Sequence, residues 1–162
     1  MNLFEEVFRA LNKERVKYLV VGGVAVNLHG YMRFTGDLDI LLLLEEKNLK
    51  KMGKVMENLG YSERLPVSIL DLSDKKMVKN WLKEKNMRAF SFMPPKDNPL
   101  QIDIITEESL KFENIFDRKI TKKISGVSIP VVSIEDLIKM KKKAKRSQDL
   151  IDLEALIELK GL

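Results

Sequence analysis

Two carboxylates, Asp37 and Asp39, stand two residues apart at the start of an apolar segment. Because successive side chains of a strand point to opposite faces, residues two apart share a face, and both carboxylates would project together. Two negative charges held that close repel each other unless a positive charge lies between them. Magnesium prefers hard oxygen ligands and binds through one or two carboxylates together with substrate phosphates. The pair therefore predicts a site for a divalent cation and a phosphorylated substrate.

A glycine pair precedes these acids by about fifteen residues. Gly22 and Gly23 follow the apolar run Tyr18–Val21, which is typical of a short buried strand. Neither glycine has a Cβ, so the backbone can turn sharply there and bring its amides close to a ligand. Residues 24–29 are predicted to begin a helix whose free N–H groups and dipole face an anion. Gly-Gly turns are common, but one followed by an Asp-x-Asp pair predicts a phosphate-binding turn.

The glycine pair followed by Asp-x-Asp and a hydrophobic strand resembles the active-site signature of the nucleotidyltransferase superfamily with the DNA polymerase beta-like fold. The resemblance implies transfer of a nucleoside monophosphate from a nucleoside triphosphate such as ATP to an acceptor hydroxyl or phosphate. It also implies two Mg²⁺ ions, which Mn²⁺ can replace, held by carboxylates around the phosphates.

The family signature requires a third acid, and Asp103 offers one within the apolar run LQIDII. A lone carboxylate is poorly accommodated in a core unless it is paired or binds a metal. If this strand lies beside that of Asp37 and Asp39, the three acids form the catalytic and metal-binding cluster. Asp103 would then ligate the ion nearer the acceptor and help to deprotonate its hydroxyl. The alternative is a residue on the edge of a hairpin that faces solvent.

Two residues of the loop before the acids match the resembling families. Arg33-Phe-Thr35-Gly-Asp37-Leu-Asp39 fits their Arg-x-Thr-x-Asp-x-Asp run position by position. Arg33 would grip a phosphate with its fork of donors, or alternatively form a salt bridge that orients an aspartate. Thr35 is included among the nucleotide-binding positions, although a turn-stabilising hydroxyl is the simpler interpretation. One departure is Gly23, where many family members have a serine whose hydroxyl helps to hold a phosphate.

A basic segment near the end of the chain carries a second resemblance. The run LIKMKKKAKRSQDLIDLEAL is similar to the closing helices of small nucleotidyltransferases related to abortive-infection toxins. Their Lys-x4-Arg-x2-Asp pattern falls here on Lys141, Arg146 and Asp149. By that resemblance Lys141 would contact the triphosphate, and Arg146 or Asp149 would orient the site. The alternative is a solvated, lysine-rich end of a helix.

The remaining pattern of apolar residues places these candidates on a single domain, residues 1–162. Strands alternate with helices but also form hairpins, which predicts an α+β fold. The expected architecture is a mixed, mainly antiparallel sheet with helices mostly on one face, followed by C-terminal helices. The core would span residues 1–132 and the helical segment residues 133–160. Residues 61–72 are ambiguous, and Thr106 is predicted to cap a helix that runs to Phe116.

Composition narrows the class of protein. With no cysteine and one histidine, thiol catalysis, disulfides and zinc chemistry are disfavoured, and a cytoplasmic location is expected. No apolar run reaches the length of a membrane span, so no membrane partner is expected. The net charge of +5 favours an anionic partner, although lysine-rich surfaces are also common in proteins from hot environments.

The acceptor stays open at this stage. The end of an RNA is slightly favoured by the basic C-terminal run, and a protein side chain is a second candidate. A small antibiotic-type molecule is a third. The toxin resemblance further implies a toxin–antitoxin system with an antitoxin protein as partner. An interaction module that binds nucleotides without turnover is the opposing class. Residues 61–99 match nothing familiar, and acceptor specificity is expected there.

Overall fold

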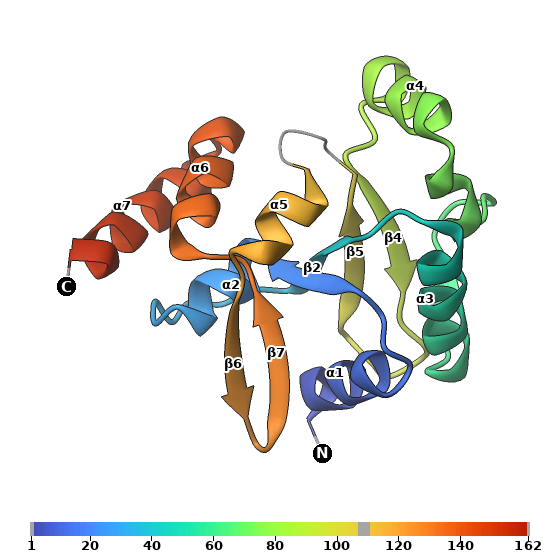
Figure 1. Cartoon of the computed structure of the whole chain (residues 1–162), viewed down its shortest axis with the longest axis horizontal. Coiled ribbons are helices and arrows are strands. Elements are labelled where there is room, and N and C mark those ends of the chain that lie inside the picture. The colour runs from blue at the N-terminus through green and yellow to red at the C-terminus, as the bar shows by residue number, and fades with distance from the viewer. Residues whose placement is uncertain (1, 107–110, 162) are drawn as a thin grey trace.

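The protein folds around one mixed sheet, as the computed structural model describes it for residues 2–106 and 111–161 (Figure 1). The described strands are β1 (Tyr18–Val21), β2 (Asp37–Leu42), β3 (Ser62–Glu63), β4 (Ala89–Met93), β5 (Gln101–Ile105), β6 (Ile120–Ile124) and β7 (Val127–Val131). The helices are α1 (Leu3–Lys13), α2 (Gly22–Leu28), α3 (Glu46–Asn58), α4 (Lys75–Lys85), α5 (Phe112–Asp117), α6 (Ile134–Ala144) and α7 (Ser147–Gly161), with a 3₁₀ turn, η1, at Ile69–Ser73.

The order of the strands confirms the predicted fold class. Across the described residues the sheet runs β3-β4-β5-β2-β1-β7-β6. The pairs β1–β2, β3–β4, β4–β5 and β6–β7 are antiparallel, whereas β1–β7 and β2–β5 are parallel. The two parallel pairs join the hairpins on either side of β1 and β2. The strands that carry the acids therefore lie in the middle of the sheet.

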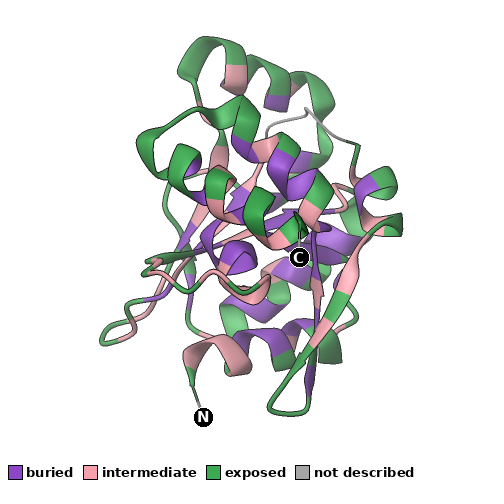
Figure 2. Cartoon of the chain, turned by 90° about the vertical axis from the view of Figure 1, so that its left-hand side faces the viewer, coloured by how far each residue is buried: buried purple, intermediate pink, exposed green. Residues whose placement is uncertain are grey.

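One face of the central strands is apolar and forms the core. Leu38 and Ile40 of β2 lie beside Ile102 and Ile104 of β5, and all four side chains are fully buried. Helices α1 and α3 pack on this side of the sheet (Figure 1), and the ring of Phe8 in α1 stacks on that of Tyr18 with the centroids 6.2 Å apart. Along the helices, buried residues alternate with exposed ones (Figure 2). Because side chains alternate along a strand, the intervening residues point to the other face. These intervening residues include the acids.

The C-terminal helices lie together on the side of the molecule remote from α3 (Figure 1). Ser133 caps α6 by accepting a hydrogen bond from the amide of Asp136 at 3.1 Å. Helix α6 ends at Lys145, which has a left-handed backbone conformation, and α7 begins two residues later. The short turn between them leaves α7 packed against α6. No helix within the described residues is long and apolar enough to cross a membrane.

Two local predictions needed correction or resolution. The predicted cap at Thr106 is wrong, because α5 begins at Phe112 and the Thr106 hydroxyl instead donates to the carbonyl of Met87 at 3.1 Å. Residues 107–110 of that predicted helix lie outside the described part of the chain. The ambiguous segment 61–72 contains the two-residue strand β3 and most of the 3₁₀ turn η1, with residues 64–68 as an irregular link between them. Its short strand forms one edge of the sheet.

Candidate active site

The three predicted acids meet on the polar face of the sheet. Strands β2 and β5 are parallel neighbours, and their register places Asp39 directly opposite Asp103. Adjacent strands lie about 4.8 Å apart, so the two carboxylates emerge side by side. Asp37 lies two residues before Asp39 and shares its face. Asp103 is therefore not a hairpin-edge residue, since β5 lies between β4 and β2.

Burial and neighbouring charge shift the pKa values of Asp37 and Asp39. Burial, together with the neighbouring charges of Asp103 and Asp37, raises the pKa of Asp39 to about 7, although Lys141 and Arg146 oppose the shift. Burial and the charge of Asp103 also raise the pKa of Asp37. Groups with such shifts are those in which a charge lacks full compensation. The cluster therefore carries negative charge that the side chains around it do not neutralise.

The glycine pair packs directly against the acids and the loop before them. Gly22 has a φ of +66°, and a Cβ at this position would clash with Oδ2 of Asp39. A Cβ on Gly23 would lie 2.5 Å from Oγ1 of Thr35 and 3.0 Å from Nη2 of Arg33. Both positions thus exclude side chains because the acid strand and the loop approach the turn so closely.

Arg33 is held by a partner at the far end of the sequence. Its Nε and Nη2 donate to the two carboxylate oxygens of Asp152, each at 2.7 Å. Its Nη1 also donates to the carbonyl of Phe34 at 2.7 Å, which fixes the loop backbone. The orienting salt bridge considered for Arg33 therefore exists, but with Asp152 of α7 and not with Asp37 or Asp39. Within the described part of the chain, the hydroxyl of Thr35 makes one long hydrogen bond, 3.4 Å, to the carbonyl of Asp37.

The three C-terminal candidates also come together. The ammonium of Lys141 is buried, with 6% of the residue exposed, and lies 2.9 Å from Oδ1 of Asp149 and 2.9 Å from Oδ2 of Asp152. Arg146 donates from Nε to Oδ2 of Asp149 at 2.8 Å. An ammonium has three N–H groups, so Lys141 keeps one donor beyond these two ion pairs. Lys141 thus joins α6 to α7 and also lines the cavities beside the acids.

Two cavities flank the acids. One of about 590 Å³ extends from Asp103 toward β4 and α6, and one of about 260 Å³ lies between Gly23, Arg33 and the start of α7. Asp37 and Asp39 line both cavities, whereas Asp103 lines only the first. The acids therefore stand at the boundary between two binding volumes, as a reaction that joins two substrates requires.

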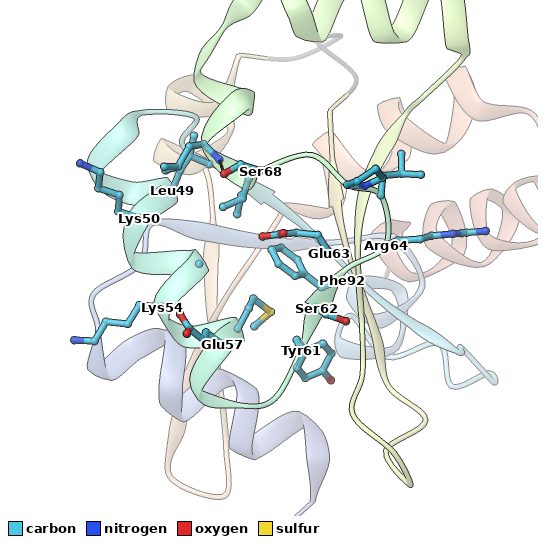
Figure 3. Close-up of a pocket in the computed structure, with 16 residues that line it drawn as sticks. Leu49, Lys50, Lys54, Glu57, Tyr61, Ser62, Glu63, Arg64, Ser68 and Phe92 are labelled. Carbon is cyan, nitrogen blue, oxygen red and sulfur yellow. Dashed lines mark hydrogen bonds between the residues drawn. The ribbon is translucent and has the colours of Figure 1, made fainter.

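A third cavity, of about 840 Å³, lies on the opposite face of the sheet between α3, β3 and η1 (Figure 3). Phe92 lines this cavity, and its neighbour Ser91 pairs with Asp103, so the ring of Phe92 and the carboxylate of Asp103 point to opposite faces of the sheet. Its lining mixes side chains such as Lys54 and Glu57 with the apolar residues of α3. This larger cavity lies away from the candidate active site.

Comparison of the whole sequence with known protein families identifies the family of this chain. Residues 1–159 match the model of a protein family described as nucleotidyltransferase of unknown function, DUF6036. The chain belongs to this family. It is a nucleotidyltransferase, an enzyme class that transfers a nucleoside monophosphate. A search of curated protein sequences found no significant match.

Solved structures show the same fold at low sequence identity. The aminoglycoside enzyme ANT(2″)-Ia, in complex with adenylyl-2″-tobramycin, is 13% identical with a TM-score of 0.60, over 95% of this chain and 85% of that one. The lincosamide antibiotic adenylyltransferase LnuA, bound to lincomycin, is 17% identical with a TM-score of 0.60, over 96% of both chains. A protein of Thermotoga maritima assigned as a nucleotidyltransferase is 15% identical with a TM-score of 0.57, over 96% and 91%.

The donor set of the nucleotidyltransferase suits a hard divalent cation. Carboxylate oxygens from Asp37, Asp39 and Asp103 face one region, and burial together with the two neighbouring acids raises the pKa of Asp39 to about 7. Among the residues that the structure describes, no three Asp, Glu, His or Cys side chains already have the geometry of a metal-binding group. Oδ1 of Asp103 instead accepts a hydrogen bond from Nε2 of Gln101 at 2.8 Å.

Asp152 is the main residue of this nucleotidyltransferase that the sequence analysis missed. Its side chain is fully buried and receives Arg33, Lys141 and Gln148. Although burial raises its pKa, these hydrogen bonds lower the pKa of Asp152 to about 2. One signal was present: Asp149 and Asp152 are three apart on a helix and share a face with the incoming lysine. Nothing local, however, indicates that Arg33 reaches the same carboxylate.

Proposed function

We propose that this enzyme transfers a nucleoside monophosphate from a magnesium-bound nucleoside triphosphate to an acceptor hydroxyl or phosphate. The observation that carries the proposal is the register of β2 and β5, which sets Asp103 opposite Asp39 on the face that the glycine turn meets. Three carboxylates in this arrangement suit the paired ions of phosphoryl-transfer enzymes. When bound, such ions neutralise the phosphates and activate the attacking oxygen.

In this proposal the triphosphate would bind in the smaller cavity and the acceptor in the larger one. Asp37 and Asp39, which line both, would hold the cations at the boundary. Arg33, Thr35 and the glycine turn surround the smaller cavity, which would take the phosphates of the triphosphate. Lys141 would add its remaining N–H donor from the side of α6. Asp103 would face the acceptor in the larger cavity, with Oδ2 available to take the proton of its hydroxyl.

The proposed reaction needs only the acceptor and the nucleoside triphosphate as substrates. The acceptor oxygen forms a bond to the α-phosphorus, the bond from the α-phosphorus to the α–β bridging oxygen breaks, and pyrophosphate leaves. The hydroxyl proton passes to Asp103 and then to solvent. Catalysis would consist mainly of holding the two substrates in line and of stabilising charge.

A labelling assay tests this function. The protein is incubated with magnesium and each of the four α-labelled ribonucleoside triphosphates, with total RNA, a cell lysate and small polyhydroxylated compounds as acceptors. We expect label to move into one of these classes, with equimolar pyrophosphate. The Asp39→Asn variant should transfer no label while keeping its fold. Stabilisation by nucleotide with no transfer to any acceptor would instead indicate a binding module.

A further inference from the structure

An exposed aromatic ring stands beside the smaller of the two cavities at the acids. Phe34 is 90% exposed, the highest value among the large apolar side chains of the described residues, and it lines this cavity together with Gly23, Arg33 and Asp39. Single exposed apolar residues are common on protein surfaces, so the exposure alone indicates no function. The position of the ring at a cavity of the candidate active site is what calls for an explanation.

The backbone of Phe34 is fixed, although its side chain extends into solvent. Its carbonyl accepts a hydrogen bond from Nη1 of Arg33 at 2.7 Å, while Nε and Nη2 of the same guanidinium bind the carboxylate of Asp152. Cε1 of the ring lies 4.0 Å from the position that a Cβ would take on Gly36, the residue before Asp37. The ring is therefore presented next to the acid strand by a loop that is already ordered, which lowers the cost of binding a ligand there.

The ring is also the one large apolar group that the described lining of this cavity offers. Apart from two glycines, every other described residue of the lining is polar or charged: Arg33, Thr35, Asp37, Asp39, Lys141, Arg146, Gln148 and Asp149. Phe34 is not among the described residues that line the larger cavity. The ring thus belongs to the side on which the proposed function places the triphosphate.

The size of the smaller cavity indicates that a nucleotide extends beyond it. Its volume of about 260 Å³ is below the roughly 300–1,000 Å³ of typical small-molecule sites. If the phosphates bind at the glycine turn, part of the nucleoside must lie outside this volume and against whatever surrounds its opening. Because the ring of Phe34 both lines the cavity and is open to solvent, it can contact that outer part.

The chemistry of the lining matches the parts of a nucleoside triphosphate. Phosphates and ribose hydroxyls are polar and suit the polar and charged side chains of the cavity. A nucleobase is a flat ring system, and aromatic side chains stack on its face whichever base it is. Among the described residues of the lining, Phe34 is the one that suits the base.

We propose that Phe34 stacks on the nucleobase of the nucleoside triphosphate. The inference rests on the proposed function, because it takes the smaller cavity as the site of the triphosphate. Stacking uses the face of the base and not its hydrogen-bonding edge, so Phe34 distinguishes a nucleotide from a bare phosphate chain and does not select one base. Phe34 binds and orients the substrate, and it takes no part in making or breaking bonds.

A matched pair of substitutions in one loop tests the proposal. Phe34→Ala removes the ring, and Met32→Ala truncates a side chain that is 77% exposed and is not among the described residues lining either cavity at the acids. Calorimetry with magnesium measures the binding of ATP and of inorganic tripolyphosphate, which has no base. Phe34→Ala should weaken ATP binding about tenfold, as loss of one base–aromatic stack does, and leave tripolyphosphate binding unchanged. Phe34→Tyr and Met32→Ala should bind both as wild type does.

Kinetics and thermal unfolding complete the test. In the labelling assay, Phe34→Ala should raise the KM for the triphosphate about tenfold at an unchanged kcat, and both alanine variants should unfold at the temperature of the wild type because both side chains are exposed. ATP binding that is unchanged in Phe34→Ala, or weakened equally with that of tripolyphosphate, would overturn the stacking contact and leave the transferase function standing. Equal losses in Phe34→Ala and Met32→Ala would also overturn it and would indicate an apolar surface for a protein partner.

Failure of the proposed function would give a different result. Pyrophosphate release would then be absent with every acceptor and every triphosphate. A loss of ATP binding but not of tripolyphosphate binding in Phe34→Ala would still support the contact between the ring and the base in such a protein.

Discussion

Asp39 and Asp152 are the same kind of side chain in two neighbouring clusters, and their pKa values shift in opposite directions. The pKa of Asp39 is raised to about 7, chiefly by burial and by Asp103, and that of Asp152 is lowered to about 2 by the hydrogen bonds it accepts. Asp39 faces other carboxylates across a strand pair, whereas Asp152 receives Arg33 and Lys141. Lys141 lines the cavities of the first cluster while it is bonded within the second.

The opposite shifts distinguish two kinds of cluster. The carboxylates around Asp39 repel one another, whereas the carboxylate of Asp152 is already paired with Arg33 and Lys141. In the proposed function, cations neutralise the charge among Asp37, Asp39 and Asp103, so we expect this cluster to destabilise the folded protein until they bind. The ion pairs around Asp152 join α7 to α6 and to the loop at Arg33, so they fix the surroundings of the site. We therefore propose that the first cluster supplies the chemistry and that the ion pairs of the second hold the geometry of the site.

The largest expected effect comes from removing charge in the first cluster. Asp39→Asn should reduce nucleotidyl transfer more than about a hundredfold, because a central cation ligand is lost. In metal-free protein at pH 8 the same variant should unfold at a higher temperature than wild type, since repulsion with Asp37 and Asp103 disappears. Initial rates of label transfer and thermal unfolding with and without magnesium check both statements. A variant that is both less active and less stable would show that Asp39 serves the fold instead.

Removing the centre of the second cluster should act mainly on stability. Asp152→Ala leaves Arg33 without its bidentate partner and Lys141 with only one of two, which should cost roughly 3 kcal/mol of unfolding free energy. Urea unfolding measures this loss. Glu154→Ala is the matched control, because Glu154 carries the same charge on an exposed part of the same helix. Equal losses in the two variants would contradict the bracing role of Asp152.

The two clusters also predict opposite dependences on pH. The depressed pKa of Asp152 gives a stabilisation of about 2 kcal/mol that is present above pH 4 and lost as the pH falls toward 2. The raised pKa of Asp39 acts in the other direction: metal-free protein loses stability as the pH rises from about 4 to about 7. Unfolding free energies between pH 2 and pH 8 should therefore rise and then fall. Asp39→Asn should flatten the upper limb alone, and saturating magnesium should remove it.

The smallest effect is expected from Arg33→Lys, which keeps the positive charge and changes the geometry of its hydrogen bonds. Arg33→Lys keeps the positive charge beside Asp152 but cannot form the two parallel hydrogen bonds or the bond to the carbonyl of Phe34. We expect a loss of about 1 kcal/mol in stability and a severalfold rise in the KM for the triphosphate. Steady-state kinetics and urea unfolding check these values. A kcat that falls while KM stays constant would instead place Arg33 in the chemical step.

Site residues could be predicted from the sequence where their positions depend on near neighbours in the chain, and not where they depend on contacts between distant segments. Asp37 and Asp39 share a face because of strand geometry alone, and a lone acid within LQIDII is conspicuous for the same local reason. The glycine turn needed only adjacent residues. The position of Asp152 depends on which helix packs beside the site, and no local pattern encodes that choice. Tertiary packing brings its partner Arg33 to it.

In the fold, too, local elements were predictable from the sequence and long-range strand pairing was not. Hairpins and amphipathic helices were predicted well because alternation and capping residues act over a few positions. The strand pairing that creates the site joins β2 to β5 across more than fifty residues, and only the chemical need of a third acid suggested it. Thr106 was mistaken for a helix cap because its hydroxyl satisfies the carbonyl of Met87, which is remote in sequence.

The bond between Arg33 and Asp152 joins residues separated by 119 positions. During synthesis on a ribosome, the acid strands and the glycine turn are complete long before α7 emerges. An unfinished chain consequently lacks the carboxylate that secures the loop at Arg33. The enzyme would become competent only when α7 has emerged and docked against this loop.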